Sequence, residues 1–276
     1  MKLRLFSVSA LVLLLAACGG GPPAPPALAY GVPSTPEVVY GYSDTTSVRI
    51  SAMGQSLELS QLGSADFAVT FGTTAAGLTV RFAVSRLAAV INQPMGAPLR
   101  IDESDVSGDL VFGLDRMGNA TVSELPDVSE AASQLMSGLD LAHTFFPGLP
   151  GRAVEVGEGW VDTVSYQGAE GPGERTERAI LSYTVLGDTV IAGRALLAIA
   201  LTGTSEATQA MTVAGMDIDM TSDLDVEGNI LWDRQRGLLF ESIKTSSGAG
   251  TVTVPISPVP LPIVIESTQR ARLQGS

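Results

Sequence analysis

The sequence predicts a mainly β protein: a curved antiparallel sheet or partly open barrel of two similar halves, with one central helix. Val, Thr, Ile and Ser dominate its strand-like segments, glycine occurs 30 times, and aromatic residues make up only 5% of the chain. Short β-branched segments separated by glycine are typical of antiparallel sheets and not of helical bundles. We therefore expect a single β-rich domain over residues 37–276, preceded by a signal segment and a tether.

The N-terminal segment predicts a lipoprotein signal peptide over residues 1–17. Lys2 and Arg4 provide positive charge, and residues 5–15 form an apolar segment. This segment is too short to span a bilayer, because a membrane helix needs about 20 apolar residues. It leads into Leu-Ala-Ala-Cys, in which Cys18 is the single cysteine of the chain. The alternative is an ordinary secretory signal with an incidental cysteine.

The Leu-Ala-Ala-Cys segment resembles the lipobox of bacterial lipoproteins. The resemblance implies that Cys18 is the lipid attachment site, with diacylglycerol on its thiol and usually a further acyl chain on the new N-terminus. Because two or more acyl chains anchor a protein stably, the membrane is an expected partner through the lipid anchor. Gly19, where some lipoproteins carry aspartate, implies the outer membrane, facing the periplasm.

Residues 18–36 are predicted to form the lipidated cysteine and a tether. The segment after Cys18 contains six prolines and no charge. Proline at this density favours an extended, polyproline-like backbone, which suits a spacer between an anchor and a domain.

The first half of the domain, residues 37–126, is predicted to be a meander of antiparallel strands. The segment from Leu78 to Arg86 alternates apolar with polar or small residues, which indicates a strand with one buried face. Asp115 and Gly118 lie between two further strand-like segments, and these residue types favour a hairpin turn.

One helix is predicted over about residues 128–144. Asp127 and Glu130 have the spacing of a capping box, apolar residues recur at helical spacing, and Pro147 prevents continuation. The apolar face of this helix must pack on the sheet. The candidates for a ligand-binding surface at this interface are Leu135, Met136, Leu139, Phe145 and Phe146.

The second half, residues 152–276, contains the clearest alternation, from Met216 to Glu227. One face of this strand is apolar (Met216, Ile218, Met220, Leu224 and Val226), and the other is acidic (Asp217, Asp219, Asp223, Asp225 and Glu227). The proline-rich segment 251–265 predicts an edge hairpin with an apolar tip. That tip either contacts lipid or a hydrophobic partner, or folds back over the core.

An internal similarity supports two related halves. Gly-Asp-Leu-Val-Phe at 108–112, followed by Asp115 and Gly118, parallels Gly-Asn-Ile-Leu-Trp at 228–232, followed by Asp233 and Gly237. Both a duplication and two ordinary hairpins account for this pattern.

Composition and motifs argue against several function classes. The net charge of −13 and the absence of clustered Lys and Arg argue against nucleic acid as a partner. The chain has one histidine, His143, and no Gly-x-Ser-x-Gly motif, so we expect no catalytic triad and no enzyme activity. One histidine and one acylated cysteine cannot form a zinc site, and we expect no metal or cofactor. Carboxylates along an extended strand are spread out, which favours a solvated face over a calcium site.

The outline of an apolar-lined sheet, a covering helix and a lipid anchor resembles the LolA/LolB and LppX/LprG class of bacterial lipoprotein and lipid carriers. The resemblance implies a curved sheet over an apolar cavity that binds a lipid or another hydrophobic ligand. Those carriers have several helices where this chain offers one. The alternative is a structural or assembly lipoprotein that docks a partner protein through its acidic strand face.

Overall fold

The computed structural model describes residues 26–275 except 53, 76, 94–95, 134–136, 171–172, 214–215, 256 and 258. The predicted signal peptide and Cys18 therefore lie outside the described residues. Within them, no helix is both long and apolar enough to cross a membrane.

The chain is mainly β, as the sequence predicts. Its strands are β1 Glu37–Ala52, β2 Gln55–Thr73, β3 Leu78–Asn92, β4 Leu99–Asp102, β5 Val106–Ser107, β6 Leu110–Leu114, β7 Ala120–Glu124, β8 Asp127–Val128, β9 Gly159–Glu170, β10 Gly173–Ile191, β11 Arg194–Val213, β12 Met216–Asp233, β13 Leu238–Thr253 and β14 Leu261–Leu273. Twelve of them form one antiparallel sheet in the order β7-β6-β3-β2-β1-β14-β13-β12-β11-β10-β9, with β4 paired to β3, while β5 and β8 pair separately.

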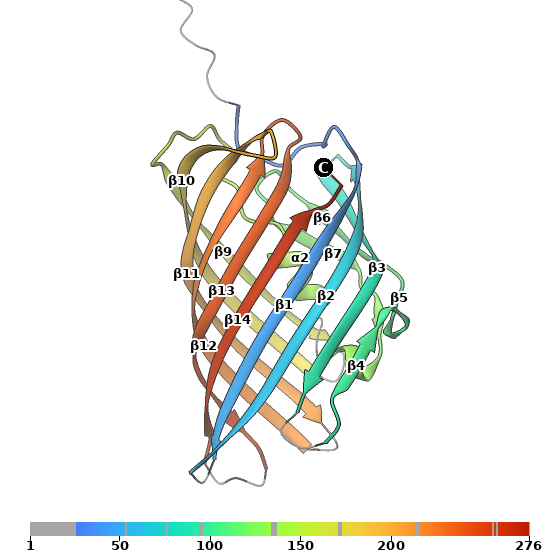
Figure 1. Cartoon of the computed structure of the whole chain (residues 1–276), viewed down its shortest axis with the longest axis vertical. Helices are drawn as coiled ribbons and strands as arrows, with labels where there is room; N and C mark the ends of the chain where they lie inside the picture. The colour runs from blue at the N-terminus through green and yellow to red at the C-terminus, as the bar shows by residue number, and fades with distance from the viewer. Residues whose placement is uncertain are drawn as a thin grey trace, which may run out of the picture.

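The sheet is strongly curved, and this confirms the predicted fold class. The first and last strands, β1 and β14, pair along their length, so the two halves of the chain join in one sheet. β7 and β9 are the two edges, and they do not pair with each other. Figure 1 shows β9 to β11 crossing behind the front strands, with α2 inside the curve. We call the end with the loops 74–77, 115–119, 192–193 and 234–237 the upper end, and the end with the β1–β2 and β13–β14 hairpins the lower end.

Glycines on the inner face permit this curvature. The inner positions Gly203, Gly248 and Gly250 lie directly against the backbone of the neighbouring strand. A Cβ atom at Gly248 would lie 2.1 Å from the carbonyl oxygen of Asp223. Since real Cβ atoms do not approach so closely, side chains at these positions would push the strands apart.

The main core fills the upper end with aromatic side chains. Phe145 and Phe146, which follow α2, lie at its centre and are buried. The Phe145 ring centroid is 4.9 Å from that of Phe82 and 5.3 Å from that of Tyr40, both edge-on. Edge-on packing of this kind adds about 0.5–1.5 kcal/mol per pair beyond the burial of area.

The prediction of a single helix over residues 128–144 is wrong. The structure has two short helices, α1 Glu130–Ser133 and α2 Gly138–Thr144. Ser137 has an extended backbone, and its hydroxyl accepts a hydrogen bond from the Asp140 amide (2.9 Å), so a new helix begins there. The predicted cap is also wrong, because Asp127 pairs with Ser107 in the small sheet and the Ser129 hydroxyl accepts from the Ala132 amide instead.

The predicted tether of residues 18–36 is wrong for its second half. Leu28 and Tyr30 are buried in the core. The Leu28 amide donates to the Arg152 carbonyl, the Tyr30 amide donates to the Arg116 carbonyl, and the Tyr30 hydroxyl donates to the Pro147 carbonyl. The domain therefore begins close to residue 28.

The two similar segments form equivalent hairpins at the upper end. The β6–β7 pair has a bulge at Val111/Phe112, and the β12–β13 pair has one at Leu231/Trp232. Asp115 and Asp233 each accept two backbone amides of the turn that follows. The repeated sequence thus encodes the same bulge and turn, and both a duplication and two ordinary hairpins remain open.

Candidate functional site

The three predicted ligand-binding residues that the structure describes, Leu139, Phe145 and Phe146, do not line the space beside α2. Phe145 and Phe146 pack in the aromatic core, and Leu139 lies against Gly168 of β9. Leu135 and Met136 lie outside the described residues. The space beside α2 measures about 20 Å³, which is close to the room for one water molecule. The helix–sheet interface is therefore tightly packed where the structure describes it.

A second apolar surface lies at the lower end, on the inner face of the sheet. We call it the inner apolar face. Its members are Val48, Ile50, Ile218, Met220, Leu224, Val252, Val254, Ile263 and Ile265. Val252, Ile263 and Ile265 are buried, whereas the other six are only partly buried. Within the described part of the chain, the main contacts of α1 and α2 are with β4, β6, β7, β8 and β9, and none of these strands carries a member of the inner apolar face.

Polar side chains separate the inner apolar face from the aromatic core. Along β1, inward residues change from Ile50 and Val48 to Asp44 and then to Tyr40. The two neighbouring strands carry polar residues at the same level, because Asp44 pairs with Gln269 of β14 and Gln269 pairs with Lys244 of β13. On this wall of the sheet the inward side chains are therefore apolar at the lower end, polar at a middle level and aromatic at the upper end. We call the middle level the inner polar cluster; it comprises Asp44, Asp140, Tyr166, Arg175, Glu177, Ser205 and Lys244.

Glu177 is the most connected member of the inner polar cluster. Its carboxylate accepts hydrogen bonds from the Tyr166 hydroxyl (2.8 Å), the Ser205 hydroxyl (3.0 Å) and Arg175 Nε (3.2 Å). Burial opposes its ionisation, but the Arg175 guanidinium and these hydrogen bonds outweigh burial and hold the pKa of Glu177 below its ordinary value. Glu177 is therefore ionised and fixed in position.

Tyr166 lies between two carboxyl groups. Its hydroxyl is 2.9 Å from Asp140 Oδ1 as well as 2.8 Å from Glu177. Burial and then the charge of Asp140 raise the pKa of Tyr166, so the phenol keeps its proton. The hydroxyl has a single proton and can donate to one carboxylate at a time. His143 stacks on the Tyr166 ring at 5.0 Å, and burial lowers the pKa of His143.

Lys244 adds a second cation, and its ammonium donates to the Thr144 carbonyl at the end of α2 (3.1 Å). Burial lowers the pKa of Lys244, while the charges of Asp140, Glu177 and Asp44 oppose this change. The inner polar cluster therefore holds three carboxyl groups and two cations. Its carboxyl groups can accept hydrogen bonds from a polar ligand group, and its two cations can donate them. Among the described residues, no three His, Cys, Asp or Glu side chains could hold a metal ion.

We expect Asp44→Asn to stabilise the protein by about 1 kcal/mol at neutral pH. Burial raises the pKa of Asp44 above 3.8, even though Thr46, Gln61 and Gln269 donate hydrogen bonds to it. The folded state therefore prefers the protonated carboxyl, and the cost of the charge grows as pH rises through the folded-state pKa. Asparagine keeps the acceptor oxygen and carries no charge.

Urea unfolding at several pH values would test this prediction. The variant should exceed the parent in unfolding free energy at pH 7 and match it well below pH 3.8, where Asp44 is protonated in both the folded and the unfolded state. A variant that is less stable than the parent at pH 7 would contradict the prediction.

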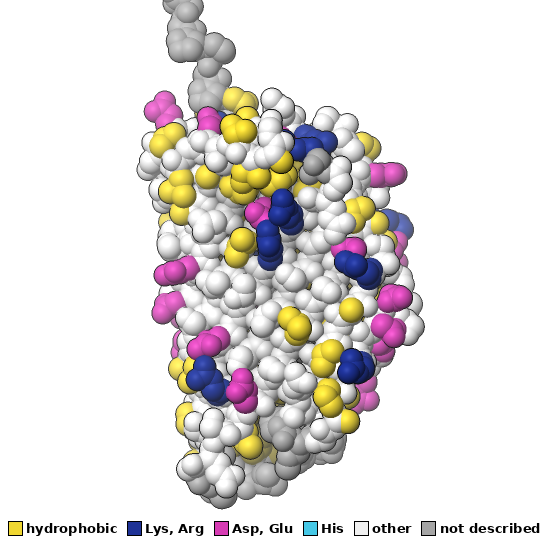
Figure 2. Space-filling view, in the orientation of Figure 1, with side chains coloured by type: hydrophobic (Ala, Val, Ile, Leu, Met, Phe, Trp, Pro, Cys, Tyr) yellow, Lys and Arg dark blue, Asp and Glu magenta, His cyan; other side chains and the backbone are white. Residues whose placement is uncertain are grey.

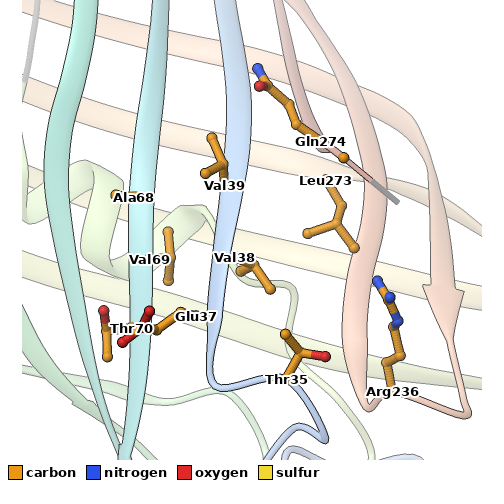
Figure 3. Close-up of a pocket in the computed structure, with 11 residues that line it drawn as sticks. Thr35, Glu37, Val38, Val39, Ala68, Val69, Thr70, Arg236, Leu273 and Gln274 are labelled. Carbon is orange, nitrogen blue, oxygen red and sulfur yellow. The ribbon is translucent and has the colours of Figure 1, made fainter.

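A shallow groove of about 540 Å³ lies at the upper end, around the start of β1 (Figure 3). Figure 3 shows Glu37 and Arg236 on different sides of it, with Val38 and Leu273 between them and Val69 beside Glu37. The groove is separated from the inner apolar face by most of the length of β1, because Val38 and Ile50 lie at opposite ends of that strand. It is therefore not part of the candidate site.

The acidic face predicted from the sequence lies on the outside of β12. Asp217, Asp219, Asp223, Asp225 and Glu227 are all exposed. Asp223 pairs across the sheet with Glu206 of β11, which adds another carboxylate to this side. The other acidic cluster, Asp102 to Asp105, forms a short 3₁₀ helix whose carboxylates cap its own backbone.

Sequence reasoning identified part of the inner apolar face and missed the inner polar cluster. The alternation from Met216 to Glu227 correctly placed Ile218, Met220 and Leu224 on one face. The signal for the cluster was available in Arg175 and Glu177, which share the inward phase of β10 with buried Ala179.

No family model matches this sequence, and no curated protein matches it. Among solved structures, the β domain of the Bordetella autotransporter BrkA is similar over 86% of this chain and 99% of its own, with 6% identity and a TM-score of 0.25. A protein assigned as AttH from Nitrosomonas europaea is similar over 84% of this chain and 92% of its own, with 11% identity and a TM-score of 0.20. Both TM-scores are too low for either likeness to bear on the fold or function of this chain.

Proposed function

We propose that this protein is a lipid-anchored protein of the cell envelope that binds an amphiphilic, hydrophobic ligand on the inner face of its sheet. The lipobox-like segment supports an anchor at Cys18 and a place on the outer membrane, facing the periplasm. The ligand's apolar chain would lie on the inner apolar face, and its polar group would meet the inner polar cluster.

One observation carries this proposal: six inward apolar side chains at the lower end are only partly buried. Burial of apolar area contributes about 25 cal/mol per Å², so leaving such a surface uncovered gives up stabilisation that a bound apolar chain would recover. The upper end, built from the same strands, is filled by Phe145 and Phe146. The lower end has no such filling within the described chain.

The inner polar cluster favours an amphiphile over a plain hydrocarbon as the ligand. A buried polar group must be hydrogen-bonded, and the inner polar cluster offers an ammonium, a guanidinium, hydroxyls and carboxylates directly beside the inner apolar face. Asp44 and Val48 lie on the same face of β1, close together along the strand. A ligand with a polar head and an apolar tail can satisfy both levels.

Leu224→Glu is expected to weaken ligand binding at least about tenfold, which corresponds to about 1.4 kcal/mol. The new carboxylate would lose its hydration when an apolar chain covers it. Leu62→Glu is the matched control, because Leu62 is 60% exposed on the outer face of β2. Titration with a fluorescent long-chain fatty acid would measure both variants. Equal affinity for Leu224→Glu and Leu62→Glu would refute the proposed site.

Organic-solvent extraction of the protein from its native host would test the function independently of a chosen probe. A lipid or other amphiphile that is recovered in proportion to the protein supports the proposal. A protein that carries no extractable ligand and does not bind the probe would contradict it.

A second candidate is a structural or assembly lipoprotein that docks a partner protein through the acidic face of β12. Four exposed carboxylates, Asp219, Asp223, Asp225 and Glu227, make no ion pair with Lys or Arg in the described part of the chain. Such a row favours a basic partner and a contact that weakens with salt. Absence of an extractable ligand, together with a salt-sensitive cross-link from β12 to a neighbouring protein, would support this candidate instead.

A further inference from the structure

The upper end of the domain is held close to any anchor at Cys18. The described chain enters at this end, where Leu28 and Tyr30 are fixed by backbone hydrogen bonds and by burial. Only eight residue steps separate Cys18 from Pro26. A fully extended chain spans at most about 3.6 Å per residue, so Pro26 cannot lie more than about 29 Å from the anchored residue.

The same end carries a set of exposed apolar side chains. They are Val32, Met117, Val156, Leu186 and Val190, and Val156 and Val190 are 69% and 70% exposed. Figure 2 shows hydrophobic side chains gathered at the upper end. Single exposed apolar residues are ordinary, but a group at one end of a protein marks a contact surface.

Backbone hydrogen bonds hold four of these side chains in two groups. In the first, the Val156 loop is tied to β10, because the Gly157 amide donates to the Val185 carbonyl and the Val185 amide donates to the Glu158 carbonyl. This places Val156 beside Gly187, next to Leu186. In the second, the Tyr30 amide donates to the Arg116 carbonyl, which brings the segment leading to Val32 beside Met117.

Charges of both signs balance at this end: several of them are paired within the protein, while Arg116, Arg236, Glu37 and Glu155 form no ion pair among the described residues. Arg152 forms an ion pair with Glu158 (3.3 Å), and Arg234 forms one with Asp188 (3.1 Å). A surface that already neutralises its own charges gains little from anionic lipid. It suits the zwitterionic headgroup region of a bilayer, into which apolar side chains can insert.

We propose that the upper end docks on the membrane that holds the lipid anchor, with Val156, Leu186 and Val190 inserted at the headgroup boundary. This inference rests on the proposed anchor at Cys18. In this orientation the long axis of the sheet points away from the bilayer, and the lower end with the inner apolar face is the part farthest from the anchoring membrane. A ligand would then enter and leave from the aqueous side or from a partner beyond it.

Site-directed spin labelling of the acylated protein in phosphatidylcholine vesicles would test this orientation. Val156→Cys carries the label at the upper end, and Val259→Cys is the matched control at the tip of the β13–β14 hairpin, 62% exposed at the lower end. Cys18 is the single native cysteine, so acylation leaves one site for the label. We expect the Val156 label to lose access to a water-soluble nickel relaxant on incorporation into vesicles, and the Val259 label to keep it.

The possible outcomes distinguish a wrong docked orientation from a wrong assignment of the lipid anchor. An acylated protein whose two labels remain equally accessible to the nickel relaxant, or whose Val259 label alone is protected, would overturn the docked orientation. Intact mass without acyl chains, and with a second label on Cys18, would overturn the anchor itself. Protection of the Val156 label that persists in vesicles with added anionic lipid, at low and high salt, supports the apolar contact.

Discussion

Phe145→Ala is expected to lower the free energy of unfolding by about 3–5 kcal/mol, a large part of the stability of a typical domain. Phe145 is buried, and its ring contacts those of Tyr40, Phe67 and Phe82 at centroid distances between 4.9 and 6.2 Å. Removing the ring takes away both transferred area and edge-on aromatic contacts, and leaves a cavity that rigid β-strands cannot close. Urea unfolding followed by far-UV circular dichroism would measure the loss.

Two further variants make this result decisive. Phe145→Leu retains most of the apolar volume and should cost much less than Phe145→Ala. Val190→Ala, at a position 70% exposed, should change stability by no more than about 0.5 kcal/mol. If Phe145→Ala instead kept its stability and lost affinity for the fatty-acid probe, Phe145 would line a ligand site, as the sequence alone suggests, and the inner apolar face would lose its special role.

The alternation of residues predicted the sheet well because it is a local property. In the segment from Met216 to Glu227, each residue's phase along β12 decides whether it faces inward, and Ile218 and Leu224 do so. The hairpin turns at Asp115 and Asp233 were likewise readable, since each aspartate caps amides within a few residues of itself.

Features that depend on distant contacts were not predictable in this way. Tyr30 looked like part of a tether because its own neighbours are proline and small residues. Its fixed position comes from a hydrogen bond to Pro147, 117 residues away. The inner polar cluster is similar in part: Arg175 and Glu177 share one phase of β10, but the Tyr166 and Ser205 hydroxyls that bind Glu177 come from the neighbouring strands β9 and β11.

The prediction of one helix failed because two capping serine residues divide the segment. Apolar spacing from Ala131 to Ala142 fits one helix, yet serine residues at 129 and 137 each cap a separate short helix. Serine competes with the helical backbone by offering its hydroxyl to nearby amides, so two weak start signals outweighed one continuous apolar pattern.

Gly250→Ala is expected to lower the free energy of unfolding by about 3 kcal/mol, at the upper end of the usual cost of overpacking. The added Cβ would lie 2.0 Å from the carbonyl oxygen of Thr221 and 3.0 Å from the Cα atom of Ser222. These are backbone atoms of the adjacent strand β12 and cannot rotate away as the end of a side chain can. The two strands must separate, and their separation breaks the ladder between Met220 and Val252 that shapes the inner apolar face.

Gly72→Ala is the matched control for this effect. Gly72 also lies in a long strand, but the nearest atoms to its added Cβ would be 3.8 Å away, an ordinary contact. That variant should be neutral or slightly stabilising, because alanine restricts the unfolded chain more than glycine does. Equal stability of the two variants in urea would show that the inner glycines do not set the curvature. If Gly250→Ala loses stability and also binds the fatty-acid probe less tightly than Gly72→Ala does, the close approach of β12 and β13 shapes the ligand surface.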